Sequence, residues 1–234
     1  MIYGTAGTLD KKGNYMHFQF LIEDQSGEII LTHLMKKICI VYPSVTVNYK
    51  AFKGIGGFKK KNTVKEIKTG KLLNDLTLYL KGFNKSLQSI KSAIIVVLDN
   101  DTRETKDFRD KLESVASQNN ISIDHVFCIA VKEIEAWLLG DREAVLKAYP
   151  DARVSILDKY VQDSICGTWE ILADATYHGG YKKFMKDCGN TYSEIGKHKC
   201  EWAEKIGQYM IWERNCSPSF KLFMTEIYNR LPSK

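Results

Sequence analysis

The sequence AIIVVLDNDT, residues 93–102, decides the fold class. Its first six residues, from Ala93 to Leu98, are all apolar, which is typical of a short strand that is covered on both faces. The charged amphipathic pattern over residues 102–119 then predicts a helix. A buried strand followed by a helix is the repeating unit of a parallel α/β sheet, so we expect that architecture here.

Three other segments repeat this arrangement. Strands are predicted over residues 15–22, 45–49 and 121–131, and helices over residues 26–38, 64–80 and 132–139. Ser26 and Thr63 are the expected starts of the first two helices. Strands that alternate with helices predict an α/β fold with a mostly parallel four-stranded sheet, flanked by helices and joined by right-handed crossovers.

The pattern changes after about residue 141, where helical segments dominate and no apolar strand is evident. These segments cover residues 144–149, 168–175, 194–213 and 218–231. We therefore expect three parts in the chain: an N-terminal arm or hairpin over residues 1–14, an α/β domain over residues 15–140, and a helical C-terminal extension over residues 141–234 that packs on the sheet.

The composition is that of an ordinary globular protein, because 44% of the 234 residues are hydrophobic and 26% are charged. No apolar run approaches the ~20 residues needed to cross a bilayer, and no signal pattern is present. A cytoplasmic protein without a membrane partner is therefore expected. The six cysteines form no CxxC pair, which predicts reduced thiols rather than a zinc site.

Acidic residues follow three of the four predicted strands. They are Glu23 and Asp24, with Glu28 a turn later, then Asp99 and Asp101, and finally Glu133 and Glu135. The carboxyl ends of parallel strands share one edge of a sheet, and gathered carboxylates repel one another unless a cation neutralises them. Carboxylates suit Mg²⁺ or Mn²⁺, so a divalent-metal site is predicted. The alternative is that these acids cap helices or favour their first turns.

A lysine-rich segment spans residues 50–68 and contributes to the formal net charge of +6. It contains glycines at positions 54, 56 and 57, which would allow close approach to a ligand. The residues predicted to hold a nucleic-acid backbone are Lys53, Lys59, Lys60 and Lys61. Tyr49, Phe52 and Phe58 are candidates for stacking on a base. The alternatives are a solvated loop and aromatic rings that only pack.

A strand that ends in Glu, a helix, and a later strand that ends in Asp-x-Asp form the pattern of the Toprim domain, and the chain resembles that family. FLIEDQSGEIIL, GIGG, VVLDNDT, AVKEIEAWLLGD and NCSPSF make it similar to small bacterial Toprim-like proteins related to the nuclease half of OLD (overcoming lysogenization defect) proteins. The resemblance covers residues 16–231. It departs at Asp24, where the family usually has glycine, so we expect Asp24 either to adopt a strained or left-handed backbone or to add a ligand.

The resemblance implies a metal-dependent endonuclease that hydrolyses phosphodiester bonds of DNA or RNA. The implied metal ligands are Glu23, Glu28, Asp99 and Asp101, with Glu133 and Glu135 as a further pair, and Glu23 is also implied to be a catalytic residue. Lys197 is the best match to the lysine that assists the chemistry, and Lys182 is a weaker one. Similar proteins are paired with ABC-type ATPases in phage defence, which implies an effector under ATPase control, and a homodimer is a further expectation.

Two other functions stay open. Residues 99–102 also match the DxDxT signature of HAD-type phosphatases, in which the first aspartate is phosphorylated and the second acts as acid and base. In those enzymes the motif normally ends the first strand, not the third. The chain could instead be a non-catalytic interaction subunit of a defence complex, with Trp169, Trp202 and Trp212 in an interface.

Overall fold

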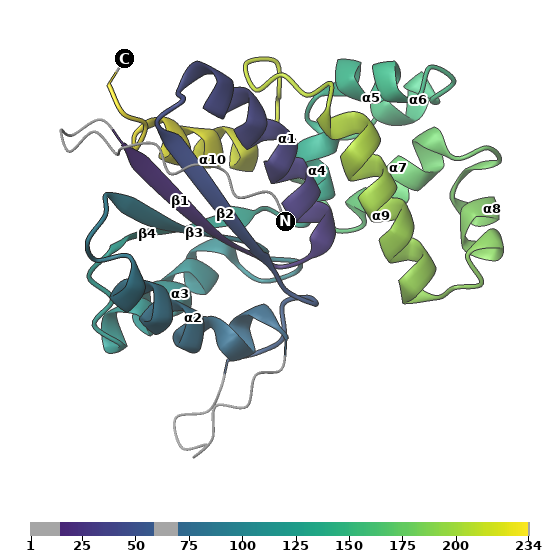
Figure 1. Cartoon of the computed structure of the whole chain (residues 1–234). Helices are drawn as coiled ribbons and strands as arrows, with labels where there is room; N and C mark the ends of the chain where they lie inside the picture. Colours follow the sequence, from purple (N-terminus) through teal and green to yellow (C-terminus); the bar gives the residue numbers. More distant parts are fainter. Residues whose placement is uncertain (1–14, 59–69, 234) are drawn as a thin grey trace, which may run out of the picture.

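The computed structural model describes residues 15–58 and 70–233. The expected arm over residues 1–14, the helix start at Thr63, and Lys59, Lys60 and Lys61 lie outside this part of the chain. The described elements are β1 (Met16–Ile22), α1 (Gln25–Val41), β2 (Val45–Ala51), α2 (Leu72–Ser86), β3 (Ser92–Asp99), α3 (Thr105–Gln118), β4 (Asp124–Ala130), α4 (Glu135–Leu139), α5 (Arg142–Ala148), α6 (Val154–Leu157), α7 (Thr168–Thr176), α8 (Gly180–Asp187), α9 (Tyr192–Gly207) and α10 (Pro218–Tyr228) (Figure 1).

Within the described residues, the strands form one four-stranded sheet in the order β2-β1-β3-β4, and every neighbouring pair is parallel. Phe20 of β1 is in register with Tyr49 on one side and Ile95 on the other. Both β1 and β3 are buried along their whole length. The predicted α/β fold with a parallel four-stranded sheet is therefore confirmed, as is the prediction that the strand beginning near Ala93 is covered on both faces.

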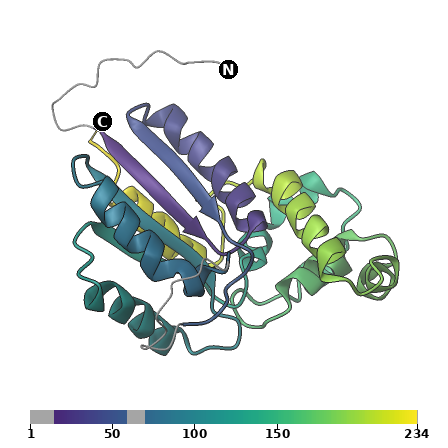
Figure 2. The same cartoon turned by 60° about the horizontal axis from the view of Figure 1, so that its bottom comes forward.

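Side chains that alternate along the strands enter two different cores, because successive residues of a strand point to opposite faces. Ile95 and Val97 pack with α1, α10 and much of the C-terminal extension. Ile94, Val96 and Leu98 pack with α2 and α3 on the other face. Figure 2 shows the sheet between these two helical layers.

The C-terminal extension was expected to pack on the sheet, and α10 does so, beside β4. The helices α5 to α9 lie beyond the carboxyl ends of the strands instead (Figure 1). Helix α9 runs against α1: His33 Nε2 lies 3.2 Å from Glu204, and Lys37 Nζ donates to the carbonyl of Met210 at 2.7 Å. The extension thus shares the core on the α1 side and borders the strand ends.

Several element boundaries differ from the predictions. Helix α1 begins at Gln25, one residue before the expected Ser26, because Asp24 provides its cap. The helix expected from residue 132 begins only at Glu135, because Lys132 has a left-handed backbone with φ 75°. Helices α6 and α8 were not predicted at all. In the described part of the chain, no helix is long and apolar enough to cross a membrane.

Asp141, between α4 and α5, joins the extension to the segment that leads into α10. Its carboxylate is fully buried and accepts hydrogen bonds from Arg214 Nε at 2.7 Å and Nη2 at 2.9 Å. It also accepts from the backbone N–H of Ile211 at 2.8 Å and of Ala144 at 3.1 Å. Charge-assisted bonds to a buried carboxylate are among the stronger polar contacts in proteins, so this junction should be stable.

We therefore expect Arg214→Ala to lower the free energy of unfolding by about 2–3 kcal/mol, because it leaves the buried Asp141 carboxylate short of partners. The control is Arg142→Ala, which removes an exposed ion pair with Asp158 and should cost less than ~1 kcal/mol. Urea denaturation of the two variants measures the difference. Equal losses would contradict the role given to Asp141.

Candidate active site

The candidate site lies at the carboxyl ends of β1 and β3, where the order of the strands in the sheet reverses. After β1 the chain continues into β2 on one side, whereas β3 lies on the other side of β1. In open α/β sheets, ligands bind in the crevice outside the carboxyl ends of the strands at such a switch point. Glu23 follows β1 and Asp99 ends β3, and the Asp99 backbone N–H donates to Glu23 Oε2 at 3.0 Å. Two predicted acids therefore meet at this crevice.

Asp24 stands at the start of α1 and caps it. Its backbone is extended, with φ −145° and ψ 178°, and its carboxylate accepts from the Gly27 N–H at 2.9 Å. The expectation of a strained or left-handed backbone is therefore wrong, and the capping interpretation is confirmed. Gly27 allows the helix to start this close to the strand, because a Cβ there would lie 2.8 Å from Ile22 Cγ2.

Glu135, the first residue of α4, brings a third predicted acid to the crevice. Its side chain is fully buried. Ser26 Oγ lies 3.3 Å from Glu135 Oε1 and 2.9 Å from Asp24 Oδ1, so one hydroxyl stands between two carboxylates. Lys199 Nζ, from α9, lies 3.2 Å from Glu135 Oε2. That oxygen accepts no hydrogen bond of good geometry from any described residue.

The lysine that lies among these acids is Lys199, two residues beyond the predicted Lys197. The Lys199 side chain is 19% exposed, whereas that of Lys197 is 69% exposed and pairs with Glu194 at 2.6 Å. Lys182, the weaker candidate, is exposed on α8. Helical spacing could have identified Lys199, because it shares a face of α9 with the buried residues Ile195, Trp202 and Ile206.

The other predicted acids have different surroundings. Asp101 has a left-handed backbone with φ 50° and pairs with Arg103 at 2.8 Å, but its charge still acts on Glu23. Glu133 Oε2 accepts from the backbone N–H of Gly167 and from Thr168, so it holds the start of α7. Glu28 lies near Tyr49, whose phenol it influences, rather than among the acids at the crevice.

Burial dominates the electrostatics of the cluster. Desolvation raises the pKa of Glu23 to about 7, against a lowering effect of the Asp99 N–H, and it raises the pKa of Glu135 to about 7. It also raises the pKa of Asp99 well above its usual range, and the charge of Glu23 adds to the effect. Burial alone would lower the pKa of Lys199, but the surrounding carboxylates raise it above the ordinary value. The cluster is therefore short of positive charge.

The donors at the crevice match a hard divalent cation in chemistry. Carboxylate oxygens are the ligands that Mg²⁺ and Mn²⁺ prefer, and Glu135 Oε2, which pairs with Lys199 but accepts no well-aligned hydrogen bond from the described residues, is such an oxygen. With side chains as placed, however, no group of three or more His, Cys, Asp or Glu in the described residues is arranged to hold a metal. Glu23 and Asp24 are turned to backbone N–H groups instead. Glu23, Asp99 and Glu135 therefore match the ion in ligand chemistry but not in the present placement of their side chains.

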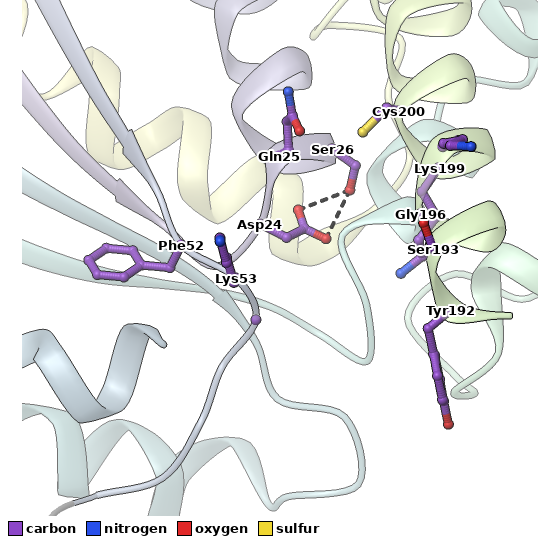
Figure 3. A pocket seen from close by; sticks show the side chains of 12 residues that line it. Asp24, Gln25, Ser26, Phe52, Lys53, Tyr192, Ser193, Gly196, Lys199 and Cys200 are labelled. Carbon is purple, nitrogen blue, oxygen red and sulfur yellow. Dashed lines mark hydrogen bonds between the residues drawn. The ribbon is translucent and has the colours of Figure 1, made fainter. Parts of the chain in front are cut away.

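A cleft of about 630 Å³ opens beside the cluster (Figure 3). One wall comes from the start of α1 and the turn after β2, where the Gly54 N–H donates to the Glu23 carbonyl at 2.9 Å. The other wall is the first half of α9. The lining residues are Asp24, Gln25, Ser26, Phe52, Lys53, Gly54, Tyr192, Ser193, Gly196, Lys197, Lys199 and Cys200. Lys53, predicted to hold a nucleic-acid backbone, thus borders the cleft.

The aromatic residues predicted to stack on a base pack against other rings of the protein, although Phe52 also lines the cleft. The Tyr49 ring stacks on Phe20 with centroids 5.5 Å apart. Phe52 is 5% exposed and meets Tyr79 edge to face, and Phe58 meets Phe108 in the same manner. The interpretation that these rings pack within the protein therefore describes them better. The exposed aromatic residue at the cleft is Tyr192, which the sequence reasoning missed.

Comparisons with known proteins give no relative from which a function could be transferred. No family model matches the chain, and no curated protein or solved structure matches it.

The raised pKa values predict how the stability of the metal-free protein depends on pH. A carboxyl group with a higher pKa when folded binds protons preferentially in the folded state, so it stabilises the fold at low pH. That stabilisation is complete below the ordinary value of 4.5 and is lost as the pH rises through about 7, the folded value for Glu23 and Glu135. Each group adds a slope of at most ~1.4 kcal/mol per pH unit.

Chemical denaturation in the presence of a chelator, repeated across this pH range, measures the effect. Glu23→Gln should give a shallower fall of stability with pH than the unchanged protein does. Mg²⁺ should raise the melting temperature more at about pH 8 than at about pH 5, because it binds the ionised carboxylates. Parallel pH profiles for the variant and the unchanged protein would contradict the burial of Glu23 as a titrating group.

Proposed function

We propose that this protein is a divalent-metal-dependent hydrolase of phosphodiester bonds in nucleic acid. The observation that carries the proposal is the group of buried Asp99 and Glu135 with the partly buried Glu23, beside Lys199 and at the switch point of a parallel sheet. Carboxylates buried with too little positive charge favour a bound cation, and a cleft with lysines beside them suits a polyanion. The resemblance to Toprim nucleases supports the same chemistry.

Each residue of the site would have a separate role. Glu23, Asp99 and Glu135 would hold Mg²⁺ or Mn²⁺, which supplies positive charge and lowers the pKa of water. Lys199 would offset the negative charge that develops on the phosphoryl oxygens, and burial among carboxylates keeps it protonated. Ser26 fixes the positions of Asp24 and Glu135, and Lys53 would hold the substrate backbone at the entrance of the cleft.

Cleavage of labelled single-stranded and double-stranded DNA and RNA tests the proposal. We expect cleavage with Mg²⁺ or Mn²⁺, none with a chelator, and a fall of at least ~100-fold in Glu23→Gln and Asp99→Asn, because each loses a ligand of the ion. The control is Glu113→Gln, which changes an exposed acid of α3 and should leave the rate unchanged. Equal cleavage by all four proteins would overturn the proposal.

The same variants separate this function from that of a HAD-type phosphatase. A phosphatase that uses Asp99 as its nucleophile would release phosphate from p-nitrophenyl phosphate and would keep most of this activity in Glu23→Gln. In the structure Asp101, which would have to act as acid and base, is paired with Arg103. We expect neither the unchanged protein nor Glu23→Gln to hydrolyse the monoester.

The lysine assignment has its own test. Lys199→Met should lower kcat by ~10²–10³-fold, because it removes a preorganised charge from the reacting phosphate, and should change KM less. Lys197→Met, two residues away on the same helix, should leave kcat within about threefold and affect KM alone. Thermal melting checks that both variants are folded. A larger fall of kcat in Lys197→Met would return the role to Lys197.

A further inference from the structure

The cleft beside the carboxylates also indicates which form of nucleic acid it takes. We propose that it binds a single-stranded segment and that Tyr192, at its outer end, stacks on an unpaired base. This inference rests on the proposed function and names its substrate more closely. Four features of the described residues carry it: the exposure of Tyr192, the spacing along α9, the open space at Gly196, and the size of the cleft.

Tyr192 is exposed to a degree that is unusual for a large aromatic residue. It is 93% exposed, the highest fraction among the large hydrophobic residues of the described chain, and it lines the cleft. It is the first residue of α9, and the helix is capped by Thr191 rather than by the tyrosine. The ring therefore contributes little to the core. A rigid aromatic face in water beside a cleft is a surface on which a base can stack.

Tyr192, Gly196 and Lys199 are spaced by four and three residues, so they lie on the same face of α9. All three line the cleft (Figure 3). Seven residues of helix separate the Tyr192 ring from Lys199 by a rise of ~10 Å. A strand whose phosphate lies at Lys199 and the carboxylates could therefore follow this face outward to Tyr192, with Lys53 on the opposite wall and Lys197 beside it.

Gly196 keeps the middle of this path open. A Cβ built at Gly196 meets no heavy atom within 4 Å, so a side chain there would project into free space. Glycine inside a helix costs ~0.5–1 kcal/mol relative to alanine, and packing gives no reason for it here. The space that the missing side chain leaves is part of the cleft, and we assign it to the ligand.

The dimensions of the cleft favour a single strand. Its volume of about 630 Å³ is within the range of ~300–1,000 Å³ found for sites that enclose one small ligand. A cleft of this size suits one or two nucleotides rather than a duplex. In a duplex, each internal base is covered on both faces by its neighbours, whereas stacking on a protein ring needs an unstacked base. Such stacking is tolerant of sequence, because every base has an aromatic face.

Fluorescence anisotropy tests the inference without cleavage, in a chelator and at low salt. The probes are a labelled oligonucleotide of ~8 nucleotides, within the usual site sizes, and a hairpin duplex of similar length. We expect the single strand to bind at least tenfold more tightly than the duplex. Tyr192→Ala should weaken single-strand binding by about 5- to 150-fold, the loss expected for one stacked base, and Tyr192→Phe should retain most of it.

A second pair of variants tests the path along α9. Gly196→Gln should weaken binding of the single strand by at least tenfold, because its side chain fills the cleft. The control is Gly82→Gln, at a helical glycine of α2 where a Cβ likewise meets no atom within 4 Å; this variant should bind like the unchanged protein. Thermal melting confirms that both are folded.

The outcomes distinguish this inference from the proposed function. Unchanged single-strand binding in Tyr192→Ala and Gly196→Gln would overturn the inference, as would a preference for the duplex. Either result leaves the proposed function standing if metal-dependent cleavage is still lost in Glu23→Gln. Loss of stacking in Tyr192→Ala together with cleavage that does not depend on Glu23 would instead overturn the proposed function and leave the binding inference in place.

Discussion

The parallel pairing of β1 and β3 is the constraint on which the rest of the site depends, because it sets Glu23 and Asp99 side by side at one sheet edge. Two carboxylates so close, with Glu135 buried next to them, would each favour protonation over charge. The structure compensates only in part, through the Asp99 N–H, the Ser26 hydroxyl and Lys199. The remaining imbalance is the physical reason for the cation site that we propose at this edge.

The C-terminal extension is part of this site rather than an appendage to the sheet. It supplies Lys199 and one entire wall of the cleft, and Glu133 fixes the start of α7 from the sheet side. The position of α9 depends on contacts with α1, such as that of Lys37 with the Met210 carbonyl. The buried Asp141 carboxylate binds the segment that follows α9. Loss of these contacts should therefore affect the chemistry as well as the stability.

The sequence predicts the strand ends well because local patterns determine them. A continuous apolar run ends at Leu98, and the parallel arrangement then brings Asp99 to the edge that Glu23 shares. The sequence is a poor guide to the direction in which a helical side chain points and to its contacts with residues far away in the chain. Glu28 lies one turn into α1 and faces Tyr49, and Glu133 finds its partners more than thirty residues later. Lys199 is intermediate in how well the sequence predicts it. The periodicity of α9 indicates that it faces inward, but no local motif identifies it.

Asp24, where the resembled Toprim pattern would have glycine, shows how one residue changes the balance of charge at this edge. A glycine there could not cap α1 through a side chain or share Ser26 with Glu135. The aspartate does both, and its charge also acts on Glu23, Asp99 and Glu135, where it further favours their protonated forms. The same residue that stabilises the helix start therefore makes the metal-free cluster less stable in its ionised form. Because a cation bound as proposed would relieve that repulsion, Asp24 would strengthen the coupling between the folding of this edge and the proposed metal binding.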